Sequence, residues 1–311
     1  PGNYLTAFSQ FKPLSYNATP LWAVRFTTGT DFPLTALAEA GLLALAALVL
    51  VYWKVLAALR EKLSGGFDYE KGLFVSLTLS LVLLLVFPAS TPLLVLTFVL
   101  LAASARVNEV TIPLSAGSAV GSRLPAAILT LPVIIGIGLL AYYGGRTFLA
   151  EYQYRRAIDF LVQNDGKGSY DTLREAINLN PYVDRYHTSY AQVNLALART
   201  IAQNENITEA DRTTISQLIQ QAIREGRATV TLNPQRSGNW EVLARTYQSI
   251  MAFATGADNF AIQTYNQAIA LDPTNPNLRI ALGGVYYALG RYDDAVRAFE
   301  LAVLAKPDLA N

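Results

Sequence analysis

The stretch that decides the fold is residues 271–307, LDPTNPNLRIALGGVYYALGRYDDAVRAFELAVLAKP. An apolar residue and a polar residue precede proline at both ends of this stretch, and the two prolines, Pro273 and Pro307, lie 34 residues apart. Similar phrases end at Pro181 and Pro234. Because proline cannot continue a helix, each phrase marks the end of a helical unit. The second half of the chain is therefore predicted to be an array of helical repeats.

The 34-residue period is that of the tetratricopeptide repeat, a helix–turn–helix unit. The signature positions of the last unit are filled by Leu282, Gly283, Tyr286, Ala295, Phe299 and Ala302. Those of the preceding unit are filled by Trp240, Leu243, Ala244, Tyr247, Ala261, Tyr265 and Ala268. We expect these residues to form the core. Gly283 and Ala295 should allow close helix approach, and Phe299 should reach the next repeat.

The first half of the chain has the composition of a membrane domain. Residues 1–145 carry 14 of the 47 charged side chains, although they make up almost half of the 311 residues. Stretches long enough to span a bilayer run from about 34 to 55, from 72 to 105 and from 124 to 145. The middle run contains Pro88 and Pro92 and is too long for one span, so we divide it into two helices.

The predicted fold is all-α, with about four transmembrane helices followed by a tetratricopeptide α-solenoid. The predicted domains are an extracytoplasmic arm (1–33), a four-helix transmembrane region (34–146) and a repeat domain (147–311). The fourth span is expected to run directly into the first repeat. Small residues at Ala36, Ala40, Ala44 and Ala47 predict one face of the first span that packs closely against another helix.

Charge predicts the orientation in the membrane. Basic residues gather in the two segments that connect the spans, whereas the hairpin between Pro88 and Pro92 has none. The positive-inside rule places these segments in the cytoplasm. The predicted localisation is therefore a multi-pass protein of the cell membrane, with the arm and the repeat domain extracytoplasmic. Arg146, Arg155 and Arg156, which follow the last span, favour the opposite orientation.

Composition also excludes several classes of function. The chain has no cysteine and one histidine, so we predict no metal site and no cofactor. The net charge of +1 provides no field for nucleic acid. His187 occupies the position that Trp240 takes in a later repeat and is predicted to be a packing or surface residue. The sequons at Asn17 and Asn206 are interpreted as incidental. Because the chain begins with Pro1, we expect an upstream region to be missing.

Several segments resemble O-antigen ligase-like and polymerase-like bacterial membrane proteins that carry tetratricopeptide tails. The segments are Pro1-Gly-Asn-Tyr4, 7–13, 19–26, the glycine-marked Glu39-Ala-Gly41-Leu, 243–245 and 267–276. The resemblance covers essentially the whole chain but only the C-terminal half of that family's length.

The resemblance implies transfer of a glycan from a lipid-diphosphate donor, in which basic side chains bind the diphosphate and a loop histidine acts as base. Arg25 matches a basic position of the loop, and Lys12 is a second candidate for contact with lipid phosphate. Thr28 and Thr35 stand where the family has its second arginine and its histidine. Threonine cannot act as this base at neutral pH, so the chain is more plausibly not an enzyme.

The preferred hypothesis is a membrane-anchored scaffold whose extracytoplasmic solenoid binds itself or other envelope proteins. We expect the last repeat to end without a polar capping helix, which leaves an apolar face for a neighbour. The alternative is the C-terminal part of a glycosyltransferase, degenerate because the histidine is absent. A third hypothesis is an assembly factor that recruits other proteins through the concave groove.

Overall fold

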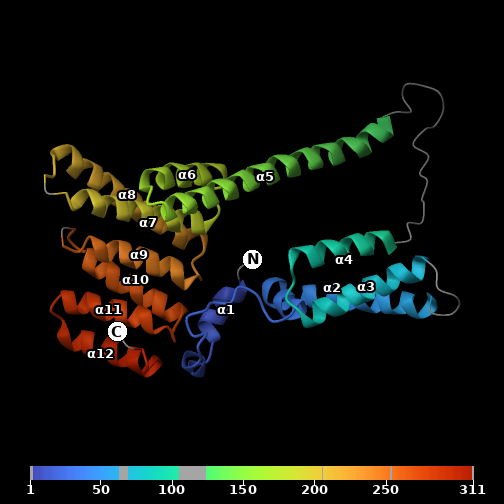
Figure 1. Cartoon of the computed structure of the whole chain (residues 1–311), viewed down its shortest axis with the longest axis horizontal. Helices are drawn as coiled ribbons and strands as arrows, with labels where there is room; N and C mark the ends of the chain where they lie inside the picture. Colours follow the sequence, from blue (N-terminus) through green and yellow to red (C-terminus); the bar gives the residue numbers. More distant parts are fainter. Residues whose placement is uncertain (1–2, 63–68, 105–123, 205, 253, 310–311) are drawn as a thin grey trace. The chain divides into compact units, whose positions relative to one another are not determined.

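The computed structural model describes residues 3–62, 69–104, 124–204, 206–252 and 254–309. Within these ranges every regular element is a helix, as shown in Figure 1, which confirms the predicted all-α class. The chain forms two compact units. The first comprises Pro1–Lys12 and Leu21–Ile112, and the second comprises Pro13–Pro20 and Pro113–Asn311.

The first unit contains α1 (Asn3–Phe11), α2 (Phe32–Lys62), α3 (Tyr69–Val86) and α4 (Thr91–Ser104). Val55 of α2 packs with Leu77 and Leu81 of α3 in its small core. The hydroxyl of Tyr52 donates a hydrogen bond of 2.6 Å to the carbonyl of Leu81, which also links α2 to α3. The break between α3 and α4 lies at residues 87–90, so the predicted division of the long apolar run is confirmed.

Helix α2 is kinked at Gly41. The backbone of Gly41 has φ of 75° and ψ of −167°, a conformation that favours glycine because it has no Cβ. Ala36 and Ala40 precede this break, whereas Ala44 and Ala47 follow it. The prediction of one continuous small-residue face was therefore wrong, because the helical period does not continue through Gly41.

Among the described residues, three helical segments are long and apolar enough to cross a membrane: Phe32–Arg60, Tyr69–Val86 and Thr130–Val162. The described part of α4 has 14 residues, or about 21 Å of helix at 1.5 Å per residue. That length is shorter than the roughly 30 Å hydrocarbon core of a bilayer. The described helices thus provide three candidates of sufficient length rather than the four that the sequence predicted, and membrane insertion itself stays a prediction.

The second unit contains a short 3-10 helix, η1 (Leu14–Ala18), and the helices of the repeat array. These are α5 (Leu124–Val162), α6 (Gly166–Leu179), α7 (Asp184–Ala202), α8 (Glu209–Leu232), α9 (Ser237–Ser249), α10 (Ala257–Leu271), α11 (Pro276–Ala288) and α12 (Tyr292–Ala305). They pair as hairpins α5/α6, α7/α8, α9/α10 and α11/α12, and each hairpin packs on the next (Figure 1). This arrangement is a tetratricopeptide-like solenoid.

Helix α5 joins the last apolar stretch to the first repeat without a loop. It has 39 residues, and its C-terminal part pairs with α6. The expected continuity between the fourth apolar stretch and the first repeat is therefore confirmed. The guanidinium of Arg146 donates hydrogen bonds to the carbonyls of Asn178 and Leu179, which anchors the middle of α5 to the C-terminal end of α6.

The proline phrases lie where each hairpin ends. Helices α6, α8, α10 and α12 each end two residues before a proline of the repeated phrase. A reciprocal capping box between Thr208 and Asp211 begins α8 and satisfies backbone N–H groups that have no partner within the helix.

Candidate protein-interaction site

Most of the signature residues form the interior of the array, but Trp240, which was predicted to lie in the core, is only half-buried. Leu243, Ala244, Tyr247, Ala261, Tyr265 and Leu282 are buried in one cluster, against which Tyr286 packs. Gly283 lies under the ring of Phe299, since a Cβ at Gly283 would be 2.5 Å from a carbon of that ring. Phe299 thus packs within its own hairpin, whereas the sequence predicted that it would reach the next repeat. These residues position the helices and leave their outer faces for binding.

The outer face of α12 is defined by comparison with α10. Ile262 and Ile269 of α10 are partly buried and pack against a cluster that α9, α10 and α11 form together, with Leu282 and Val285 from α11. The residues 34 positions later are Val296 and Val303 of α12. Phe299 lies between them and corresponds to Tyr265, which is fully buried. We call Val296, Phe299, Val303 and the adjacent Leu304 the α12 face.

The α12 face is open to solvent in this structure. Val296 is 54% exposed, Val303 is 59% exposed and Leu304 is 69% exposed. Clustered apolar side chains on a folded surface are typical of sites that bind another protein.

The other edge of the array is formed by the loops that carry the prolines. The carbonyl of each of three prolines receives a hydrogen bond from the side chain six residues later. Nε2 of His187 lies 2.9 Å from the carbonyl oxygen of Pro181, and Nε1 of Trp240 donates to that of Pro234 at 2.7 Å. Arg279 donates to the carbonyl of Pro273 in the same way. The equivalence of His187 and Trp240 is therefore visible in their contacts.

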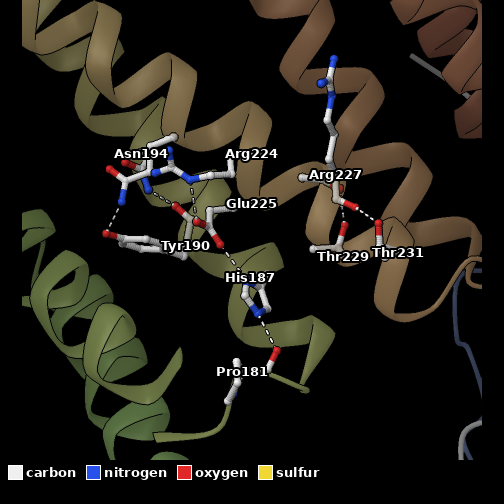
Figure 2. Close-up of polar contacts among 11 residues, drawn as sticks. Pro181, His187, Tyr190, Asn194, Arg224, Glu225, Arg227, Thr229 and Thr231 are labelled. Carbon is white, nitrogen blue, oxygen red and sulfur yellow. Dashed lines mark hydrogen bonds and ion pairs between the residues drawn. The ribbon is translucent and has the colours of Figure 1, made fainter. Parts of the chain in front are cut away.

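His187 is also paired across its hairpin, as Figure 2 shows. Its Nδ1 lies 2.6 Å from Oε2 of Glu225 on α8, and both side chains are largely buried. Burial alone would lower the pKa of His187, but the hydrogen bonds to Glu225 and Pro181 and the charges of Glu225 and Asp184 outweigh it and raise the pKa above 6.5. Two acceptors facing the two ring nitrogens favour the imidazolium form. This arrangement stabilises the hairpin and offers no open position for a substrate.

The candidate phosphate contacts lie in different environments. Lys12 is buried, whereas Arg25 is exposed. Thr35, at the histidine position of the resembled family, donates to the carbonyl of Asp31 at 2.8 Å and accepts from the amide of Gly29 at 3.0 Å. Asp31 in turn accepts from the amide of Leu34 and caps α2. The hydroxyl of Thr35 therefore closes the turn that begins α2, and the exposed Thr28 is not part of this hydrogen-bonded turn.

Helix hairpins that each end at a repeated proline phrase, with buried signature residues in the last two, form a tetratricopeptide-like array. In agreement, a family model described as tetratricopeptide repeat matches residues 259–311. Of the segments that resemble O-antigen ligase-like proteins, 267–276 alone lies within the matched residues and it belongs to the repeat, so that resemblance stays a prediction. No curated protein matches the sequence.

Solved structures with a similar arrangement include a crystal structure of MamA, with 14% identity and a TM-score of 0.41 over 62% of this chain and 97% of that one. Another is MamA MSR-1 C2, with 14% identity and a TM-score of 0.40 over 52% of this chain and 79% of that one. A thermophilic tetratricopeptide protein of Thermus thermophilus has 19% identity and a TM-score of 0.42, over 58% of this chain and 91% of that one.

Proposed function

We propose that this chain is a membrane-anchored scaffold whose repeat array binds a second copy of the chain through the α12 face. The exposure of Val296 and Val303 carries the proposal, because the equivalent Ile262 and Ile269 are partly buried against a cluster that α11 helps to form. A tetratricopeptide array has no chemistry of its own, and its function lies in the surfaces that it presents.

A second copy supplies the type of helix that this face accepts. Helix α11 covers α10 with Leu282 and Val285, and every copy carries repeat helices of that pattern. Contact between the end of one array and a different surface of the next would be heterologous, and such contacts build rings or filaments. The scaffold would then grow by adding hairpins from neighbouring copies.

Membrane anchoring is supported by α5. This helix carries apolar residues that are exposed in the structure, including Ile134, Ile137 and Leu140, before it enters the first repeat. Tyr142 and Tyr143 follow them, and aromatic residues of this kind are enriched at the membrane–water interface. In this proposal the basic connecting segments lie in the cytoplasm, and the array lies on the opposite side of the membrane.

The experiment is a mass measurement of the full chain in detergent by size-exclusion chromatography with light scattering. We expect a defined oligomer for the wild type and at least a halving of the protein mass for Val303→Asp. Tyr182→Asp is the matched control, because Tyr182 is an exposed apolar residue of the array outside the α12 face. A monomeric wild type, or a folded Val303→Asp variant that assembles as well as the control, would overturn the proposal.

A lipid-diphosphate glycan transferase is the second candidate, favoured by the exposure of Arg25 in the segment that resembles the family's loop. An exposed guanidinium can pair bidentately with phosphate. In a reconstituted glycan-transfer assay with the remaining spans supplied, Arg25→Ala should abolish transfer. An unchanged rate would eliminate this candidate.

A further inference from the structure

Residues 13–20 belong to the second unit and dock on the loop edge of the last two repeats. The centre of the contact is Asn17 in η1, which is 2% exposed. Its side-chain Nδ2 donates one hydrogen bond of 2.7 Å to the carbonyl of Thr274 and another of 2.9 Å to the carbonyl of Ala305. One amide group thus joins the loop after α10 to the last residue of α12.

Lys306 completes the contact from the side of the array. Its Nζ donates to the backbone carbonyl of Asn17 at 2.9 Å, and Lys306 as a whole is only 6% exposed. The same ammonium contacts both carboxylate oxygens of Asp308, at 2.9 and 3.1 Å, which balances its buried charge. The array therefore contacts both the side chain and the main chain of Asn17.

The contact repeats chemistry found elsewhere in the array. Carbonyls at the C-terminal end of a helix have no partner within it and need an outside donor. At the α8–α9 edge Nδ2 of Asn239 bonds the carbonyl of Asn233 and that of Thr229, which also accepts the amide of Asn233, and it contacts the carboxylate of Asp184 as well. Asn239 comes from the next repeat helix, α9. At the edge of the last two repeats Asn17 performs this role from a segment 288 positions away from Ala305.

Some polar atoms that are buried in this contact make no hydrogen bond. Among the described residues, Oδ1 of Asn17 and Oγ1 of Thr274 are buried and have no hydrogen-bond partner. An unsatisfied buried acceptor weakens an association relative to a fully paired one. The docked segment is thus held by a small number of polar contacts, centred on Asn17 and Lys306.

We infer that the loop edge formed by Thr274, Ala305 and Lys306 is a peptide-binding site that recognises a short turn presenting an asparagine, and that residues 13–20 are its resident occupant. This inference concerns a surface other than the α12 face and is independent of membrane insertion. It also assigns a role to Asn17 other than that of a glycan acceptor, since the amide nitrogen of this sequon is buried and bonded twice.

The test is hydrogen–deuterium exchange of the full chain in detergent, followed at residues 273–276 and 303–308. Asn17→Ala should speed exchange there at least tenfold. Asn206→Ala is the matched control, because Asn206 is the asparagine of the other sequon and is exposed. Equal exchange in Asn17→Ala and Asn206→Ala would overturn the inference.

A second measurement needs no substitution in the protein. Excess peptide KPLSYNATPL, which reproduces residues 12–21, should displace the resident segment of the wild type and speed exchange at residues 14–18. The same peptide with alanine in place of its asparagine should have no effect. If neither peptide changes the exchange, or if both change it equally, the site does not recognise asparagine and the inference fails.

Discussion

Trp240 and His187 occupy equivalent positions in successive repeats, and each brings a ring nitrogen to the carbonyl of the proline six residues before it, at 2.7 and 2.9 Å. Arg279 makes the same contact in the following repeat. The three side chains share little except an N–H group at the right distance from the backbone. The requirement at this position is therefore a donor for the proline carbonyl, because this carbonyl lies beyond the helix end and receives no hydrogen bond from the helix.

The first prediction concerns the protonation of His187. Burial lowers its pKa, but the hydrogen bonds to Glu225 and Pro181 together with the charges of Glu225 and Asp184 outweigh this effect, so the pKa of His187 should lie above 6.5. Because the chain has one histidine, an NMR titration of imidazole resonances reports this residue alone. Glu225→Gln should lower the pKa, since it removes the nearby negative charge. A wild-type pKa below 6.5 would contradict the assignment.

The second prediction follows from this shift. A folded-state pKa above the unfolded value means that the folded state binds the proton more tightly. The stabilisation is fully present below the unfolded pKa, near 6.5, and is lost as the pH rises through the folded pKa. Urea unfolding of the array in the full chain should show that the stability difference between wild type and His187→Gln shrinks as the pH rises. A difference that is constant with pH would refute this.

The third prediction tests the donor at Trp240. Trp240→Phe keeps an aromatic ring but removes the N–H that bonds Pro234, so we expect a loss of about 1 kcal/mol in the free energy of unfolding. Urea denaturation monitored by far-UV circular dichroism measures this change. An unchanged midpoint would show that water replaces the indole without cost.

The fourth prediction uses two adjacent glycines of α11. Gly283→Ala forces a Cβ to within 2.5 Å of the Phe299 ring and should cost about 1–3 kcal/mol of stability. Gly284→Ala is the matched control, because a Cβ there meets no atom within 4 Å and alanine favours the helix by roughly 1 kcal/mol. The two variants should therefore shift the unfolding midpoint in opposite directions. Equal shifts would contradict the close approach at Gly283.

The fifth prediction concerns the membrane. The chain has no cysteine, so single-cysteine variants can be labelled without background. Ile137→Cys should resist a water-soluble maleimide in liposomes, whereas Asn206→Cys should react. On intact cells an impermeant reagent should also label Asn206→Cys if the array is extracytoplasmic. Rapid labelling of Ile137→Cys would contradict insertion of α5.

Much of the repeat half could be predicted from the sequence. The proline of each repeated phrase ends a helix for covalent reasons, and Gly283 and Ala295 are buried where two helices approach closely. The continuity of α5 also followed from an apolar run that contains no turn phrase before the first repeat. These features depend on residues that are close together in the sequence, so the sequence predicts them.

The remaining features depend on contacts between residues that are far apart in the sequence or on backbone conformations that no local pattern predicts. Asn17 and Lys306 lie at opposite ends of the chain, and no local pattern predicts their hydrogen bond. The pairing of His187 with Glu225 depends on the register of two packed helices. The kink in α2 depends on the positive φ of Gly41, which a lone glycine in an apolar run permits but does not require.

The unbroken course of α5 has a practical consequence for dissecting the protein. Its apolar stretch and the first repeat share one ladder of backbone hydrogen bonds, so an endoprotease that cuts extended chain finds no cleavage point between them. A soluble fragment of the array must start inside this helix. It must also retain Ala150 and Ala157, whose fully buried side chains belong to the first hairpin.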